Sequence, residues 1–156
     1  MIDIVCFNGE KFDLGFSKVY SCNEFNIAYG KEDNRKLLEN KRLDILVSPE
    51  KTRKKDFIHH RNSGLNQVLC KLAKKNNLAI GISFNDILKS KEKDKLIGRI
   101  MQNIRLCRKY KVKMVLASFA TNKFEMRDPR DLMSLGICFG MNPGEAKKAL
   151  NFNKKF

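Results

Sequence analysis

The sequence contains few of the residues that usually bind metal ions. Its only two histidines are the neighbours His59 and His60. Its cysteines lie far apart and form no C-x-x-C pair; they are Cys6, Cys22, Cys70, Cys107 and Cys138. Structural zinc sites need closely spaced ligands, and metal-dependent phosphoesterases gather several histidines with carboxylates. We therefore expect no metal or other cofactor on this chain, buried free thiols that act as small hydrophobes, and histidines that are polar loop residues.

The sequence also lacks a long apolar run. The longest apolar stretches have the length of a strand, so we expect no membrane-spanning segment and no membrane partner. The first residues, MIDIVCFNGEKFDLG, lack the basic start and apolar stretch of a secretory signal. No repeat, linker or low-complexity tract interrupts the 156 residues, of which 42% are hydrophobic. This size predicts one domain over residues 1–156, in a soluble cytoplasmic protein.

Acidic residues are scarce beside basic ones. The chain has 17 Asp and Glu against 32 Lys and Arg, a formal net charge of +15. Residues 1–50 carry 7 basic and 9 acidic side chains, net −2, whereas residues 51–156 carry 25 and 8, net +17. Such an excess favours a polyanionic partner, with nucleic acid as the first candidate. A lysine-rich surface that serves solubility is the alternative.

Short β-branched or aromatic segments bounded by turn residues predict strands. They are residues 1–7, 16–22, 25–30, 42–49, 77–84, 112–119 and 135–140. Strand and helix patterns alternate from about residue 26 onward, and strands joined through helices run parallel, so the fold class is α/β. The pattern does not separate a closed barrel from an open sheet. The first 25 residues fit the alternation poorly, and we expect an irregular or hairpin-like start.

Apolar residues at helical spacing predict two longer helices. One covers residues 65–73, is capped by Asn62 or Ser63, and ends near residues 76–77. The other covers residues 91–110 and carries an apolar arc toward the sheet. Its opposite, cationic face is expected to lie in solvent and comprises Lys95, Arg99, Gln102, Arg105 and Lys109.

Two short helices are predicted from their capping residues. Asp128 stands before Pro129, and Asn142 stands before Pro143 with Glu145 placed to complete a capping box.

Several of these segments resemble one family, the protein component 3 subunit of archaeal and eukaryotic ribonuclease P. The stretches that carry the resemblance are LDILVSP at 43–49, residues 61–84, RKYKVKMVLAS at 108–118, residues 123–141 and GEAKKAL at 144–150. Their order and approximate spacing agree with the family along a single domain.

The resemblance implies a TIM-barrel-like (β/α) fold that is shortened or irregular at its N-terminal end, by roughly two βα units. It also implies a subunit of the endoribonuclease ribonuclease P, which removes 5′ leaders from precursor tRNA. In such an enzyme the RNA carries out hydrolysis and requires Mg²⁺, so no residue of this chain is expected to be catalytic.

The implied partners are the ribonuclease P RNA, precursor tRNA and other protein subunits. Among these subunits is one with a ferredoxin-like fold, bound in a heterodimer or a heterotetramer. The N-terminal fifty residues or an exposed apolar helix patch are the candidate protein interfaces.

Basic residues in loops that follow strands are the candidate RNA contacts, because these loops form the functional face of a parallel α/β domain. From these loops we predict RNA binding by Arg53, Lys54, Lys55 and Lys123. Basic residues within or beside the stretches that resemble the family are also expected to contact RNA; they are Arg61, Lys75, Arg127, Arg130 and Lys147. Lys75 could instead end its helix favourably, and Arg130 could pair with Asp128 or Asp131. Few aromatic residues lie among these cations, so recognition of RNA shape and backbone is expected rather than base-specific readout.

Asp44 precedes an apolar strand, and we expect it to accept structural hydrogen bonds. Two other functions remain open: a metal-dependent phosphoesterase on a related barrel, and a general RNA-binding protein.

Overall fold

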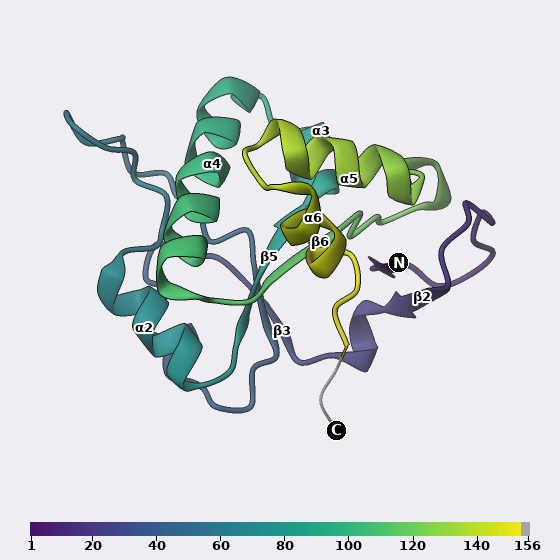
Figure 1. Ribbon diagram of the computed structural model, residues 1–156, viewed down its shortest axis with the longest axis horizontal. Helices are drawn as coiled ribbons and strands as arrows, with labels where there is room; N and C mark the ends of the chain where they lie inside the picture. The colour runs from purple at the N-terminus through teal and green to yellow at the C-terminus, as the bar shows by residue number, and fades with distance from the viewer. Residues whose placement is uncertain (154–156) are drawn as a thin grey trace.

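The computed structural model describes residues 1–153 and contains parallel strands wrapped by helices (Figure 1). One sheet pairs β1 (Ile2–Val5) with β2 (Lys18–Ser21). The other has the order β3 (Ile27–Tyr29), β4 (Ile45–Val47), β5 (Ala79–Ser83), β6 (Met114–Ala117). Backbone hydrogen bonds from Phe119 N to Ile4 O (2.8 Å) and from Cys6 N to Ala120 O (2.7 Å) join the chain after β6 to β1. The strands therefore form one continuous row.

The inner face of this row encloses its own apolar core. Alternate residues of the central strands, such as Ile45 and Val47 of β4 and Val115 and Ala117 of β6, pack there with Ile4 of β1. A Cβ atom on Gly81 would lie 3.0 Å from the side chains of Ile45 and Val47, so a glycine suits this crowded layer. Side chains from several strands that meet inside one curved sheet are the mark of a barrel.

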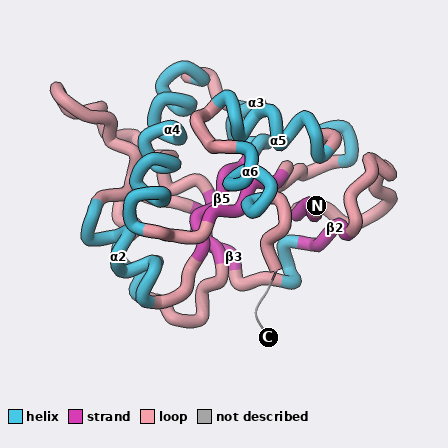
Figure 2. Tube along the Cα trace, viewed as in Figure 1, coloured by secondary structure: helices cyan, strands magenta, loops and turns pink. Residues whose placement is uncertain are grey.

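Helices cover the outer face of the strands, as Figure 2 shows. The elements are α1 (Arg35–Glu39), α2 (Gln67–Lys75), α3 (Phe84–Lys89), α4 (Lys93–Tyr110), α5 (Pro129–Cys138) and α6 (Pro143–Ala149), with short 3₁₀ turns η1 (Cys22–Glu24) and η2 (Lys123–Glu125). Leu46 and Ile80 pack outward against α1 and α2, while Ile82 and Leu116 pack against α4, α5 and α6. Within residues 1–153, no helix is long and apolar enough to cross a membrane.

The predicted TIM-barrel-like α/β fold is confirmed, with six strands in the described residues against the eight of a complete barrel. Six of the seven predicted strands are present. The prediction of a strand at residues 135–140 is wrong, because these residues end α5. Asp128 caps this helix, and Gly136, one turn after buried Leu132, faces β6, where a Cβ atom would come 2.9 Å from Leu116.

The helix starts are partly as predicted. Asp128 caps α5, and Asn142 with Glu145 forms the capping box of α6, so both predictions are confirmed. The predicted cap at Asn62 or Ser63 is wrong: Asn66 caps α2 by accepting from Leu69 N at 2.9 Å. Gly64 has a φ of +75°, which interrupts any helix before that point.

The N-terminal segment differs from a hairpin, since β1 and β2 run parallel through an irregular connection. Val5 and Ser21 are register partners, so the residues that follow them, Cys6 and Cys22, lie side by side and are joined by a disulfide. The prediction of free buried thiols is therefore wrong for these two cysteines, and it is wrong for Cys138, which is exposed. It is confirmed for the buried pair Cys70 and Cys107.

Candidate nucleic-acid interface

A basic segment between β4 and α2 projects from the body beside α4 (Figure 1). We call residues 51–61 the basic arm. Its cations are Lys51, Arg53, Lys54, Lys55 and Arg61, and its single acidic residue is Asp56. The arm leaves the carboxyl end of β4, which is the end of a parallel barrel where functional loops gather.

A buried guanidinium helps to hold the arm in place, together with Glu32, which accepts from Arg53 N at 2.8 Å and from Thr52 Oγ1 at 2.7 Å. Arg99 of α4 is only 3% exposed. Its Nε donates to Asp56 Oδ1 at 2.8 Å, and its other nitrogens donate to the backbone carbonyls of Glu50 (3.2 Å), Thr52 (3.1 Å) and Lys54 (2.7 Å). The prediction that Arg99 faces solvent is wrong because the arm folds back over this face of α4 and covers it. Arg99 thus fixes the backbone from which the arm's cations extend.

Arg61 lies against α4 at the other end of the arm. Its backbone N–H donates to Gln102 Oε1 at 2.9 Å, and its carbonyl accepts from Gln102 Nε2 at 2.8 Å. Its guanidinium Nη1 lies 3.4 Å from Asp56 Oδ2. A Cβ atom on Gly98 would lie 2.4 Å from Arg61 Cζ, so this helical glycine leaves room for the guanidinium.

Charge on the arm is only partly balanced within the chain. Partial burial opposes ionisation of Asp56, but hydrogen bonds from Asn62 N–H and Arg99 outweigh it and lower the pKa of that carboxyl. Asp56 is thus ionised at neutral pH and balances Arg99 and Arg61. In the described part of the chain, Arg53, Lys54 and Lys55 have no carboxylate within ion-pair distance. Three exposed cations therefore remain available to an anionic partner.

The root of the arm contains two acidic side chains in different states. Asp86 accepts hydrogen bonds from Ser48 Oγ at 2.6 Å and from Lys51 Nζ at 2.9 Å. Burial raises the pKa of Glu50 to about 8, despite a hydrogen bond from Asn103. One acid is thus paired and the other is mostly protonated at neutral pH. Across residues 1–153, no group of three His, Cys, Asp or Glu side chains could hold a metal ion.

Three other predicted contact residues lie between the end of β6 and the first turn of α5, and internal contacts occupy two of them. Lys123 lies 3.6 Å from Glu10. Arg127 donates from Nη1 to the carbonyls of Phe124 (3.0 Å) and Met126 (2.7 Å). Arg130 is exposed, and the structure described here shows no ion pair between its side chain and Asp128 or Asp131.

An acidic residue on the same rim is strongly ionised. Burial works against the charge on Glu125, but hydrogen bonds from Lys89 and Thr121 outweigh it and lower the pKa of the carboxyl to about 2. Lys89 Nζ lies 2.9 Å from Glu125 Oε1, so this lysine is engaged within the chain.

The remaining two predicted contacts lie at the opposite end of the strands. Lys75 ends α2 just before β5, and Lys147 lies on α6, whose following residue Leu150 accepts a hydrogen bond from Ile2 at the start of β1. The structure therefore groups four of the predicted contacts on the arm, places three near the loop after β6, and separates Lys75 and Lys147 from both.

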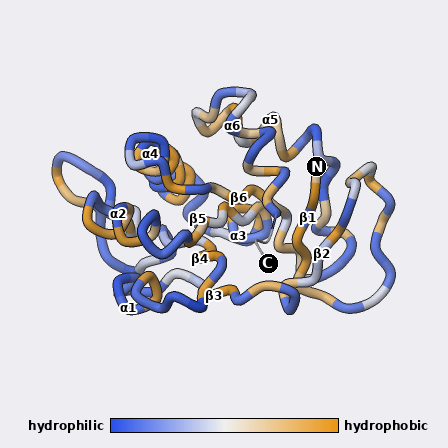
Figure 3. Tube along the Cα trace, turned by 60° about the horizontal axis from the view of Figure 1, so that its bottom comes forward, coloured by the Kyte–Doolittle hydropathy of each residue, from blue (hydrophilic) through white to orange (hydrophobic). Residues whose placement is uncertain are grey.

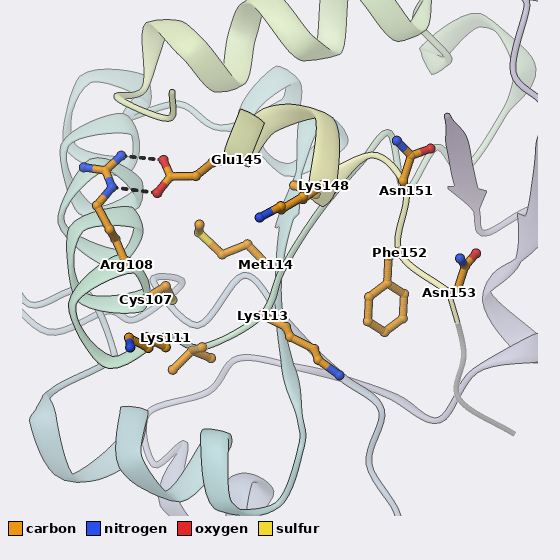
Figure 4. A pocket seen from close by; sticks show the side chains of 12 residues that line it. Cys107, Arg108, Lys111, Lys113, Met114, Glu145, Lys148, Asn151, Phe152 and Asn153 are labelled. Atoms are coloured by element: carbon orange, nitrogen blue, oxygen red, sulfur yellow. Dashed lines mark hydrogen bonds and ion pairs between the residues drawn. The ribbon is translucent and has the colours of Figure 1, made fainter. Parts of the chain in front are cut away.

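A second cation-rich site lies at this amino end. We call it the amino-end pocket; it has a volume of about 440 Å³, and the charged or aromatic side chains in its lining are Arg108, Lys111, Lys113, Glu145, Lys148 and Phe152 (Figure 4). Arg108 forms a two-pronged ion pair with Glu145, with Nε–Oε1 and Nη2–Oε2 distances of 2.7 and 2.6 Å. The hydrogen bond from Arg108 is the main cause that lowers the pKa of Glu145.

Comparison with known proteins identifies the family. Residues 2–155 match the family model described as RNase P subunit p30. This chain belongs to the ribonuclease P subunit p30 family. The match to this family confirms the resemblance found in the sequence.

Two archaeal relatives show how much of the p30 family protein the chain represents. It is 34% identical over 154 residues to ribonuclease P protein component 3 of Methanosarcina acetivorans, covering 96% of this chain and 61% of the relative. It is 37% identical over 124 residues to the component 3 protein of Thermococcus gammatolerans, covering 78% of this chain and 54% of the relative. The chain thus spans little more than half the length of these p30 relatives.

A solved structure supports the fold of this p30 family chain. A chain in a cryo-EM structure of archaeal ribonuclease P with mature tRNA superimposes with a TM-score of 0.74 at 23% identity, covering 97% of this chain and 87% of that one.

The contacts that hold the arm were not predicted from the sequence. Arg99 and Gly98 lie in α4, where the helical pattern places Arg99 toward solvent, and the partners of both residues lie 37 to 49 positions earlier in the chain. Two features of the sequence could have indicated this arrangement. Asp56 is a single acidic residue within a basic run, and Gly98 lies in a helix interior, where glycine costs about 1 kcal/mol relative to alanine.

Proposed function

We propose that this chain is an RNA-binding protein subunit of ribonuclease P and supports removal of 5′ leaders from precursor tRNA. The basic arm carries the proposal: Arg53, Lys54 and Lys55 stand exposed on a backbone fixed by buried Arg99, in a chain of the p30 family. Arginine offers two-pronged hydrogen bonds to phosphate, and lysine offers a mobile point charge.

The proposed partners follow from the family and from the structural neighbour. They are the ribonuclease P RNA, precursor tRNA, and other protein subunits, among them a ferredoxin-like protein in a heterodimer or heterotetramer. The neighbour belongs to an archaeal ribonuclease P that holds mature tRNA, which supports the first two. We also propose a cytoplasmic location, because the relatives come from archaea, whose cells have no nucleus.

In this role the chain positions RNA and the RNA performs hydrolysis. The arm's cations reduce repulsion between RNA phosphates that must approach each other in the folded state, and they release condensed counterions on binding. The Mg²⁺ that hydrolysis needs is proposed to be bound by the RNA, with no metal or other cofactor held by this chain. Asp86 with Lys51, and Glu50 in its protonated form, serve to fix the root of the arm.

Reconstitution of tRNA cleavage tests the proposal. Ribonuclease P RNA and the other subunits would be assembled with and without this chain, and 5′ cleavage of a precursor tRNA would be measured at modest Mg²⁺. We expect faster cleavage with the chain, and little stimulation by a variant with Arg53, Lys54 and Lys55 changed to Gln.

Two outcomes would favour other functions. A chain that binds RNA but leaves cleavage unchanged would be a general RNA-binding protein. A purified chain that retains divalent metal and hydrolyses phosphate esters without RNA would be a phosphoesterase.

A further inference from the structure

The outer end of the basic arm is apolar. Phe57 is 56% exposed and Ile58 is 95% exposed, although both are residues that folding usually buries. The ring of His60 stacks on that of Phe57, with centroids 4.5 Å apart and planes at 28°. Figure 3 shows the projecting segment as mostly hydrophilic with a short hydrophobic stretch near its outer end. We call residues 57–60 the arm tip.

Both ends of the arm tip are fixed to the body. Asp56, just before it, accepts from Arg99 Nε at 2.8 Å and from Asn62 N at 2.8 Å. Arg61, just after it, exchanges two backbone hydrogen bonds with Gln102. Only four residues span these anchors, so the stacked rings of Phe57 and His60 are presented outward on a short, braced loop.

We infer that the Phe57–His60 pair is a stacking platform for an unpaired RNA base, with Ile58 packing against the edge of that base. The inference rests on the proposed function and deepens it. Aromatic faces beside cations are the usual means of holding unpaired nucleotides, and stacking tolerates any base because each has a flat π-face. The arm would thus contact both the backbone and a base.

The surroundings of the arm tip favour RNA over a protein partner. A hollow of about 380 Å³ next to the tip is lined by His59, His60, Arg61, Gln102 and Arg105, together with Gly98 and Met101. Arg105 is exposed, and none of the residues that line this hollow is acidic; Glu32 and Asp33 line a separate hollow of about 540 Å³, which Phe57 and His60 also line. An unpaired nucleotide stacked on Phe57 would place its phosphate within reach of these guanidinium groups, whereas an apolar protein surface would leave them without partners.

Equilibrium binding to a ribonuclease P RNA transcript, with no other protein present, tests the inference. Phe57→Leu keeps apolar bulk and removes the ring, and we expect it to weaken binding about tenfold, in keeping with the loss of one stacked base. Phe57→Trp should retain wild-type affinity. The salt dependence of binding should be unchanged by Phe57→Leu, because stacking releases no counterions. Equal melting temperatures would show that the variants fold.

Phe124→Leu is the matched control, because Phe124 is 73% exposed at the same carboxyl-end rim but on the loop after β6, where Lys123 and Arg127 are engaged within the chain, and we expect it not to affect binding. Wild-type affinity in Phe57→Leu, or an equal loss in Phe124→Leu, would overturn the stacking platform. A loss seen only when other protein subunits are present would assign the tip to a protein instead. If the wild-type chain does not bind the RNA, both the stacking platform and the proposed function are contradicted. If the wild-type chain binds the RNA and Phe57→Leu binds it equally well, only the stacking platform is contradicted.

Discussion

The basic arm and the amino-end pocket both concentrate positive charge, but they hold it differently. In the pocket, Arg108 is bound to Glu145 through its Nε and Nη2 atoms. In the arm, buried Arg99 and the carboxylates of Asp56 and Glu32 fix the backbone, while the side chains of Arg53, Lys54 and Lys55 form no ion pair in the described residues. Lys111 and Lys148 of the pocket likewise form no ion pair in the described residues, so the two regions differ in placement: the arm carries its cations on a projecting segment braced by Arg99, whereas the pocket's lysines line a hollow at the amino end of the strands.

The largest effect should come from the buried guanidinium of the arm. Arg99→Met removes one donor from Asp56 and a donor from each of three buried or partly buried carbonyls, so we expect a loss of roughly 3–5 kcal/mol in the free energy of unfolding. Denaturant unfolding measures it. Arg105→Met, an exposed residue of the same helix, should cost less than about 0.5 kcal/mol. Equal costs for the two variants would mean that Arg99 does not hold the arm.

The buried carboxyl of Glu50 at the root of the arm should make the stability of the protein depend on pH. Its pKa in the folded protein is about 8, above the unfolded value of about 4.3. Between these values only the folded state keeps the proton, so stability falls as pH rises through this window. Glu50→Gln removes this loss, and its stability advantage over wild type should grow by up to a few kcal/mol from pH 5 to pH 9. Thermal unfolding across that range measures it, and a pH-independent difference would contradict the buried, protonated state.

Matched charge removal compares the two basic regions directly. Changing Arg53, Lys54 and Lys55 to Gln should weaken binding to ribonuclease P RNA at least about tenfold at 0.1 M salt and flatten its salt dependence. Changing Lys111, Lys113 and Lys148 of the amino-end pocket to Gln removes the same formal charge, and we expect RNA affinity to fall by less than about threefold. A filter-binding titration at several salt concentrations measures both, and equal losses would show that binding follows total charge.

The smallest effect is expected from the ion pair of the amino-end pocket. The side chain of Arg108 is 43% exposed, so solvent screens its attraction to Glu145. Arg108→Met should lower the melting temperature by roughly 1–2 °C. If Arg108→Met lowered the melting temperature as much as Arg99→Met does, the exposed and the buried arginine would contribute equally to stability, which contradicts the comparison.

The strands and several helix ends could be predicted because their causes are local. Short apolar segments bounded by turn or charged residues predict β4 and β6, and Asp128 and Asn142 stand directly before the helices that they cap. The start of α3 was missed because Ser83, the last residue of β5, also caps the helix. No turn residue separates the strand from that helix.

The candidate site was only partly predictable because its order comes from distant contacts. The basic run of the arm is plain in the sequence, but Arg99 meets Asp56 across 43 positions, and a helical pattern alone assigns it to solvent. The stack of Phe57 and His60 likewise depends on the path of the loop. Sequence identifies the charges here, and the fold decides which of them stay unpaired.

Lysine footprinting tests the central claim, that RNA binds the basic arm. Acetylation of the chain alone and bound to ribonuclease P RNA, followed by mass spectrometry, reports every lysine in one experiment. We predict protection of Lys54 and Lys55 in the complex and unchanged reactivity of Lys111 and Lys148. Protection of the amino-end lysines with unprotected arm lysines would contradict the account.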